Sequence, residues 1–331
     1  IAIQISKLRF FISLLIEQDV DDSKENRDIR ALPNLETKFV AANALIELGE
    51  SQSFKSQEVI NLEEELFKVR ERIFYTNSRF EKHDLQRKLS DIRNKLNTEL
   101  AKVGFPNDKA EKITQWDPFD QNTHADWFDP EWMFGVKTGF DIVIGNPPYI
   151  QLQKAFDAKR KYADLYKDQK FKTFDRTGDI YCLFYEKGIN LLYDGGHLAF
   201  ITSNKWMRAR YGEKLRQFFN GYNPKILIDL GPGVFEHATV DTNILIIQKS
   251  KNRKRLHAVT INEKKKDNID FSTLLEQNGV LLQNLTDDAW FIGSDAEQRL
   301  KEKIERIGKP LKDWDVNIYY GIKTGLNEAF I

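Results

Sequence analysis

The chain has 331 residues, and its 50 basic and 50 acidic side chains give a formal net charge of zero. Hydrophobic residues make up 41% and charged residues 30%, which is typical of a folded protein and excludes a disordered one. The single cysteine, Cys182, excludes a disulfide framework and a multi-cysteine metal site, and its setting favours a buried small residue over a nucleophile. No apolar run approaches the roughly 18 residues of a membrane span, so we expect no membrane partner.

The first third of the chain is mainly helical in pattern. Apolar residues recur at three-to-four spacing over residues 1–17, which predicts a helix. The short run at 38–42 predicts a buried parallel strand. Residues 57–103 carry two apolar stripes separated by a stretch without period, so we predict an antiparallel helical hairpin. Such a hairpin packs either on its own domain or on a neighbouring chain.

Strands and helices alternate in the rest of the chain. An acidic, aromatic loop at 117–135 precedes them, and we expect it to lie away from any nucleic acid. Within this loop, His124 and Asp126 lack a third ligand for a metal. The expected elements are strands at 140–144, 197–202, 225–230 and 242–248 and helices at 180–192, 213–220 and 295–307. The alternation predicts an α/β fold with a doubly wound, mostly parallel sheet.

Charge is unevenly distributed despite the neutral sum. Residues 154–176 hold eight basic side chains against four acids, and residues 249–266 hold eight against one. Such a run is either a solvated face or a surface for phosphates. Because the first run closely follows the motif described next, we favour phosphate contact for both.

A four-residue motif, Asn146-Pro147-Pro148-Tyr149, directly follows a predicted buried strand. Ligands bind at the carboxyl ends of strands in open α/β sheets. An exocyclic amino group is a poor nucleophile, and the Asn146 side-chain oxygen with the Pro147 carbonyl can accept its two N–H bonds and direct its lone pair outward. Tyr149 offers an aromatic face for a base taken out of its stack. The motif therefore indicates methyl transfer to an amino group; a tight turn with an incidental aromatic is the alternative.

The sequence resembles the S-adenosylmethionine-dependent adenine-N6 DNA methyltransferases, specifically the type IIG group in which restriction enzyme and methylase are fused. The resemblance rests on five segments in the family's order: residues 117–135, 139–150, 177–207, 231–249 and 319–331. It implies a methyltransferase fold with an inserted helical hairpin and S-adenosyl-L-methionine as cofactor. It also implies double-stranded DNA as partner, a role in restriction–modification or phage defence, and a cytoplasmic location in a bacterium.

The resemblance assigns roles to individual residues. The motif at 146–149 becomes catalytic, and Phe235 becomes the aromatic that contacts the flipped adenine opposite Tyr149. Asn43 takes the place of a family Asp that binds the cofactor's adenine amino group, with Ala44 as its packing neighbour. Ile180 and Phe184 fall where the family's helix touches the cofactor, although their spacing of four fits core residues equally well.

Departures from the family pattern shape the expected domain organisation. The glycine-rich cofactor loop and the acidic residue that binds the cofactor ribose lie upstream of the first helix in the family. We therefore interpret the chain as an internal fragment that binds cofactor weakly or not at all and is inactive alone. We expect residues 1–250 to form the methyltransferase domain and 251–331 a linker and the start of a target-recognition region, with any nuclease outside the chain. Two alternatives stay open: a methyltransferase for protein glutamine or RNA, and a non-catalytic DNA-binding or assembly module.

Overall fold

A computed structural model describes residues 2–49, 56–120, 123–235, 240–261, 269–283 and 285–316. The helices are α1 (Ala2–Ile16), α2 (Gln57–Tyr75), α3 (Arg79–Lys102), α4 (Asn107–Gln115), α5 (Pro130–Phe134), α6 (Tyr162–Tyr166), α7 (Tyr181–Asn190), α8 (Glu213–Asn220), α9 (Phe271–Asn278) and α10 (Asp295–Ile307). The strands are β1 (Phe140–Gly145), β2 (Leu192–Ser203), β3 (Asn223–Gly231), β4 (Thr242–Gln248), β5 (Arg255–Thr260) and β6 (Val280–Gln283). The predicted helical hairpin and the strands after residue 139 are thus confirmed.

The six strands form one sheet in the order β1-β2-β4-β3-β5-β6. The pairs β1–β2 and β3–β5 are parallel, whereas β2–β4, β3–β4 and β5–β6 are antiparallel. The α/β class is confirmed, but the sheet is mixed rather than mostly parallel, because β4 runs back between β2 and β3. As a result β1, β2, β3 and β5 all end at one edge of the sheet.

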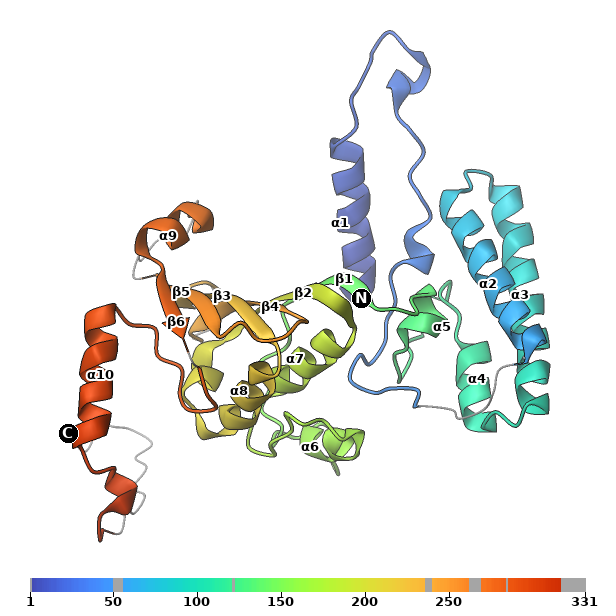
Figure 1. Cartoon of the computed structure of the whole chain (residues 1–331). Helices are drawn as coiled ribbons and strands as arrows, with labels where there is room; N and C mark the ends of the chain where they lie inside the picture. The colour runs from blue at the N-terminus through green and yellow to red at the C-terminus, as the bar shows by residue number, and fades with distance from the viewer. Residues whose placement is uncertain are drawn as a thin grey trace.

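Helices cover the two faces of the sheet unequally (Figure 1). The apolar residues of α7 and α8 pack on one face in a core that includes Leu198, Leu227 and Leu245. Gly188 permits the close approach of α7, since a Cβ there would lie 2.5 Å from Leu198 Cδ1. On the other face α9 covers β3 and β5, while Ile144 of β1 is 81% exposed. The Asn146–Tyr149 motif therefore follows a strand of which only the face toward α7 is packed.

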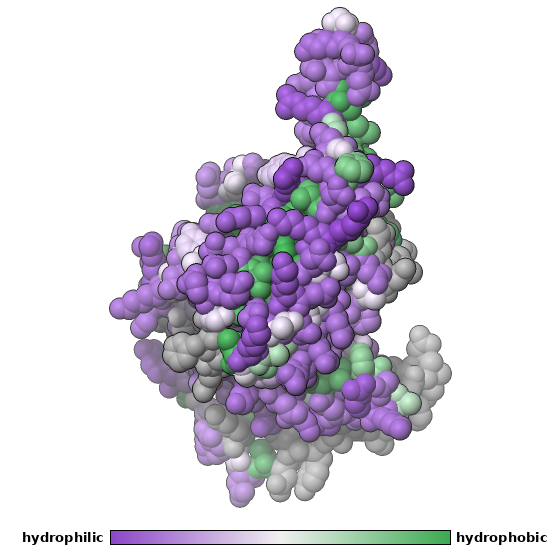
Figure 2. Space-filling view, turned by 90° about the vertical axis from the view of Figure 1, so that its right-hand side faces the viewer, coloured by the Kyte–Doolittle hydropathy of each residue, from purple (hydrophilic) through white to green (hydrophobic). Residues whose placement is uncertain are grey.

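The hairpin of α2 and α3 forms a second core beside the sheet. Its two predicted stripes are buried together with aromatic residues of the 117–135 segment, including Trp127 and Trp132. Ser56 and Ser78 cap the two helices by accepting hydrogen bonds from Val59 N and Glu81 N. The side of the molecule that carries this hairpin is mainly hydrophilic, as Figure 2 shows. Among the described residues, the hairpin thus packs on its own chain.

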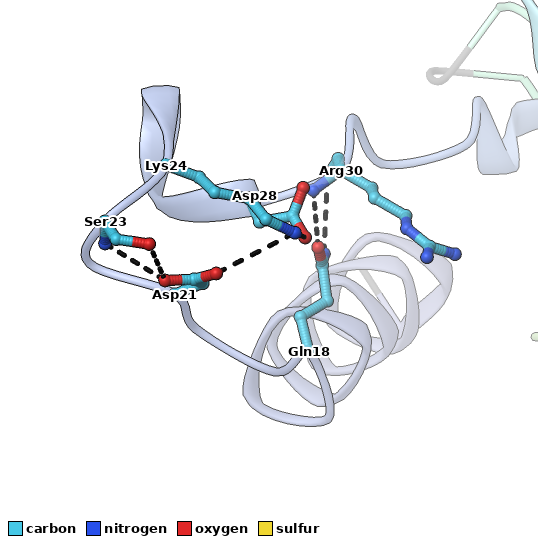
Figure 3. A network of polar contacts seen from close by, with 6 residues as sticks. All are labelled: Gln18, Asp21, Ser23, Lys24, Asp28 and Arg30. Carbon is cyan, nitrogen blue, oxygen red and sulfur yellow. Dashed lines mark hydrogen bonds and ion pairs between the residues drawn. The ribbon is translucent and has the colours of Figure 1, made fainter.

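Helix α1 and the loop after it project from the body as an arm (Figure 1). Polar contacts hold the tip of this arm, as Figure 3 shows: the side chain of Gln18 bonds both backbone groups of Arg30, and Lys24 bridges to Asp28 at 2.8 Å. Asp21 accepts hydrogen bonds from the backbone and hydroxyl of Ser23. The segment from Gln18 to Arg30 is therefore a locally organised turn.

One expectation about organisation differs from the structure, and a second, the domain boundary, stays a prediction. The predicted strand at 38–42 is wrong: this run is irregular and makes an isolated parallel bridge from Ala42 to Ala125. Its apolar side chains instead pack on the hairpin core through Val40 and Ala42. The predicted domain boundary is at residue 250, and the sheet pairing continues beyond it to Gln283. The segment at 319–331 lies outside the described residues.

Candidate active site

The Asn146–Tyr149 motif occupies the edge of the sheet at which β1, β2 and β3 end. Asn146 and Pro148 are exposed, Pro147 is buried and Tyr149 is half-buried. This gives the motif an anchored centre and an accessible side chain, as a ligand site at a carboxyl edge requires. The proline rings fix φ and donate no hydrogen bond, so the turn has little freedom of its own.

Backbone hydrogen bonds tie the segment after the motif to the start of α7. Leu152 N donates to Gly178 O at 2.8 Å, and Ile180 N donates to Ile150 O at 2.9 Å. Gln151 and Asp179 form the antiparallel bridge between these two bonds. Because α7 is itself packed against β2, these bonds fix the Asn146–Tyr149 turn between β1 and α7.

Three aromatic rings meet beside the turn. The ring centroid of Tyr149 lies 6.4 Å from that of Phe235 and 6.2 Å from that of Tyr181, with interplanar angles of 61° and 87°. The Tyr149 hydroxyl donates a long hydrogen bond of 3.4 Å to Ile201 O. Burial raises the pKa of Tyr149 to about 12, so the phenol is neutral at physiological pH. The structure thus brings the sequence-predicted pair Tyr149 and Phe235 together.

Asn43 and Ala44 lie half-buried at the end of the irregular 38–42 run. The Asn43 amide nitrogen lies 3.5 Å from the Tyr166 hydroxyl, and its oxygen accepts a bond of 3.2 Å from Leu45 N. That oxygen keeps a second lone pair for another donor. The adjoining Leu45 is fully buried in a cluster with Tyr166 and Ile180. The run around Asn43 therefore packs toward the start of α7.

The two predicted cofactor contacts on α7 differ in accessibility. Ile180 is 3% exposed and packs with Leu152 and Leu183, as a core residue does. Phe184 is only half-buried and packs against the edges of two hydrophobic clusters. Cys182 between them is buried, and burial raises the pKa of its thiol, so the expected inert packing role is confirmed.

Several site features escaped prediction because they depend on residues distant in sequence. A hydroxyl chain links Tyr181 and Tyr211 at 2.8 Å and Tyr211 and Asp179 at 2.9 Å. At the same edge, Asp229 Oδ1 accepts hydrogen bonds from Asn204 Nδ2 and Gly231 N at 3.0 and 3.2 Å. A cavity of about 410 Å³ adjoins this contact; Asn204, Lys205, Met207, Arg208, Asp229 and Asp241 help to line it. The only sequence signal was the position of Asn204, Lys205, Met207 and Arg208 directly after a strand.

The basic segment at 154–176 lies on the surface, and most of its cations have no ion-pair partner. All eight basic residues of the 154–176 segment are exposed. Within the described residues, ion pairs engage only Arg160, with Asp157 at 2.7 Å, and Arg176, with Asp164 at 3.2 Å. The other six cations of this segment are therefore available to an anionic partner. In the second basic run, residues 262–268 lie outside the described residues.

The acidic segment at 117–135 has structural partners on the hairpin side. Asp117 pairs with Arg93 at 3.2 Å, Asp126 pairs with Lys112 at 3.1 Å, and Asp129 caps α5 by accepting from Trp132 N. Among the described residues, histidine, cysteine and carboxylate side chains form no group of three or more that could hold a metal ion. In the same part of the chain, every helix is too short or too polar to cross a bilayer.

Known proteins that are similar to this chain are restriction-modification methyltransferases. The family model described as Eco57I restriction-modification methylase matches residues 1–235. Over 228 residues the chain is 28% identical to the type II restriction enzyme and methyltransferase RM.Eco57I of Escherichia coli, covering 67% of this chain and 21% of that protein. Over 212 residues it is 27% identical to the type II methyltransferase M.BstVI of Geobacillus stearothermophilus, covering 58% of this chain and 37% of that protein. The chain thus spans only a fifth to about a third of these relatives.

Among solved structures, the methyltransferase subunit of a type I restriction-modification system from Streptococcus thermophilus matches 66% of this chain and 40% of its own, with 16% identity and a TM-score of 0.31. The family match itself covers the hairpin, the Asn146–Tyr149 turn and every strand through β3, ending at Phe235. The chain belongs to the Eco57I restriction-modification methylase family.

Proposed function

We propose that the chain is the methyltransferase portion of a site-specific adenine-N6 DNA methyltransferase, acting within a restriction–modification or phage-defence system. The observation that carries the proposal is the Asn146–Tyr149 turn at the carboxyl edge of the sheet, with Phe235 6.4 Å from Tyr149. Membership of the methylase family supports the reaction class. The turn offers a pair of oxygen acceptors to an amino group, and the choice of adenine rests on the resemblance to the adenine-N6 methyltransferases.

The turn suits an amino group with two N–H bonds. The Asn146 oxygen and the Pro147 carbonyl each accept one of them, which holds the nitrogen lone pair toward the incoming methyl group. The new N–C bond forms as the C–S bond of the methyl donor breaks, and the amino nitrogen then loses one proton to solvent. Tyr149 and Phe235 supply aromatic surface to the base. Stacking on this surface offsets part of the free energy that is needed to unstack the base from the duplex.

S-adenosyl-L-methionine is the proposed cofactor, and it supplies an electrophilic methyl group on a sulfonium. The residues present fit one end of it. Asn43 is half-buried and keeps a lone pair to accept from an adenine amino group, and the half-buried Phe184 offers an apolar side. Ala44 would pack beside Asn43. Ile180 would act only through the packing it shares with Leu45.

Double-stranded DNA is the proposed partner, and the 154–176 segment is its proposed phosphate contact. Lys154 and Lys161 are adjacent across a turn, because Tyr162 N donates to Lys154 O at 3.1 Å. Neither lysine has an ion-pair partner within the described residues. Cations that are not neutralised internally release condensed counterions from DNA most effectively.

The test measures transfer of tritiated methyl from S-adenosylmethionine to three acceptors: bacteriophage DNA from a methylation-deficient host, total RNA and denatured cell protein. It uses this chain and the same chain lengthened upstream in its reading frame. We expect label in DNA that Asn146→Ala abolishes and that Asn94→Ala, at an exposed asparagine of α3, leaves unchanged. Label in RNA or protein alone overturns the proposal, and no transfer by either form favours the non-catalytic module.

A further inference from the structure

The hydroxyl chain beside the Asn146–Tyr149 turn takes no direct part in the proposed methyl transfer. It consists of Tyr181, the first residue of α7, Tyr211 in the 3₁₀ turn Arg210–Gly212, and Asp179. Asp179 is 9% exposed and Tyr181 is fully buried. Tyr181 and Tyr211, which are 30 residues apart in sequence, thus meet through their hydroxyls, and the ring of Tyr181 also contacts Tyr149.

The direction of the chain follows from its donors. Tyr211 has one hydroxyl proton, and it donates that proton to Asp179 Oδ2 at 2.9 Å. The 2.8 Å bond between the two tyrosine oxygens is therefore donated by Tyr181. Burial raises the pKa of both phenols, and the carboxylate of Asp179 adds to the effect, so both hydroxyls keep their protons at physiological pH. The hydrogen bond to Tyr211 thereby fixes the hydroxyl of Tyr181 and with it the orientation of the ring.

The loop that carries Tyr211 is itself fixed. Arg216 is 4% exposed and donates to the carbonyls of Trp206 and Ala209 at 2.5 and 3.1 Å. Gly212 has no room for a side chain, since a Cβ would lie 2.0 Å from Trp206 O. Tyr211 in turn lies against Gly178, where an added Cβ would be 3.3 Å from its ring. The position of Tyr211 is therefore fixed by this loop and not by its contact with Tyr181.

We propose that Tyr211 and Asp179 are positioning residues of the proposed base-binding site: they fix the ring of Tyr181, and that ring orients Tyr149. The last step is the edge-to-face contact of Tyr149 with Tyr181, at 6.2 Å and 87°. Tyr149 depends on this contact because its own hydroxyl makes only a 3.4 Å bond. The base-binding part of the inference rests on the proposed function.

The orientation itself is tested without DNA, by NMR of the chain carrying ¹³C-labelled tyrosine, with the Tyr149 signals assigned by their loss in Tyr149→Phe. We expect Tyr211→Phe to shift or broaden the ring signals of Tyr149, because the ring beneath it loses its fixed orientation. The matched control is Tyr222→Phe, which removes a hydroxyl from a half-buried tyrosine packed on Phe218, and it should leave these signals unchanged. Unchanged Tyr149 signals in Tyr211→Phe overturn the inference.

Two variants of Asp179 separate positioning from folding. Asp179→Asn keeps an oxygen that can accept from Tyr211, so the Tyr149 signals should shift less than in Asp179→Leu, which removes the acceptor. Equal shifts in the two variants contradict a role through the hydroxyl chain. If Tyr211→Phe fails to fold, this pair still decides the question.

The consequence for a base is measured with a duplex that carries 2-aminopurine opposite an abasic site, whose fluorescence is quenched when the base stacks on an aromatic ring. We expect Tyr211→Phe to reduce the amplitude of quenching by about two- to fivefold. A shift of Tyr149 with full quenching overturns the functional part of the inference. Absence of quenching by the unmodified chain counts against the proposed function instead, and the NMR result then stands by itself.

Discussion

Arg216 offers the most direct test of how the fold holds the edge that carries the site. Its guanidinium is 4% exposed and donates to three backbone carbonyls: Trp206 and Ala209 in the loop after β2, and Asp287 at 2.6 Å in the segment after β6. These carbonyls belong to irregular segments. Arg216→Met keeps most of the apolar stem and removes all three donors.

The size of the effect follows from this geometry. Each hydrogen bond to a charged donor contributes about 1.5–3 kcal/mol, and burying the cation costs part of that sum. A net loss of about 3 kcal/mol in the free energy of unfolding is therefore expected. At about 2–4 °C per kcal/mol for a large domain, the melting temperature should fall by roughly 6–12 °C.

The assay is urea unfolding followed by tryptophan fluorescence, since the indole of Trp206 lies 5.3 Å from Phe219 and 5.1 Å from Trp290 in the affected core. The control is Arg208→Met, because Arg208 lies on the same loop and is exposed. A loss below about 1 kcal/mol, or one equal to that of Arg208→Met, would refute the reasoning.

Three further predictions concern the candidate site. Tyr149→Ala should weaken binding of the duplex with an unpaired 2-aminopurine by about 5- to 150-fold, since stacking on one aromatic contributes about 1–3 kcal/mol, whereas Tyr149→Phe should change it less than about twofold; equal effects in the two variants would contradict a stacking role. Replacing Lys154 and Lys161 together with alanine should reduce the slope of log affinity for DNA against log salt by about 2 in fluorescence-anisotropy titrations, and an unchanged slope would exclude phosphate contact. Because burial raises the pKa of Tyr149 to about 12, its stabilising effect is complete below the unfolded pKa near 10 and is lost as the pH rises toward 12. The difference in absorbance at 295 nm between the unmodified chain and Tyr149→Phe should accordingly show Tyr149 ionising only as the pH approaches 12, and its ionisation near pH 10 in the folded chain would contradict this.

The sequence predicted those elements whose pattern is local. The strand at 242–248 and the helix at 295–307 have the predicted bounds. The strand is a short apolar run, and the helix lies between its N-cap Ser294 and Gly308. The strand predicted at 38–42 was wrong because a run of four apolar residues fits a strand and an irregular packed segment equally well. The direction of β4 was also missed, since periodicity carries no information on whether neighbouring strands are parallel.

In the candidate site, too, the residues of a contiguous motif were predicted and those joined by tertiary packing were not. The turn at 146–149 and its partner Phe235 were predicted from a motif and a resemblance, and they lie together. The hydroxyl chain through Tyr211 could not be found, because it joins a 3₁₀ turn to the start of a helix across 30 residues. Single-sequence patterns report chemistry that is contiguous, whereas the residues that orient it come from tertiary packing.

The measurement that tests the central claim most directly is the identity of the methylated nucleoside. DNA is incubated with S-adenosylmethionine that carries a deuterated methyl group and with the chain lengthened upstream, then digested and analysed by mass spectrometry. The account predicts labelled N6-methyladenine, which disappears with Asn146→Ala. Labelled N4-methylcytosine in its place, or labelled N6-methyladenine that persists in Asn146→Ala, would contradict it.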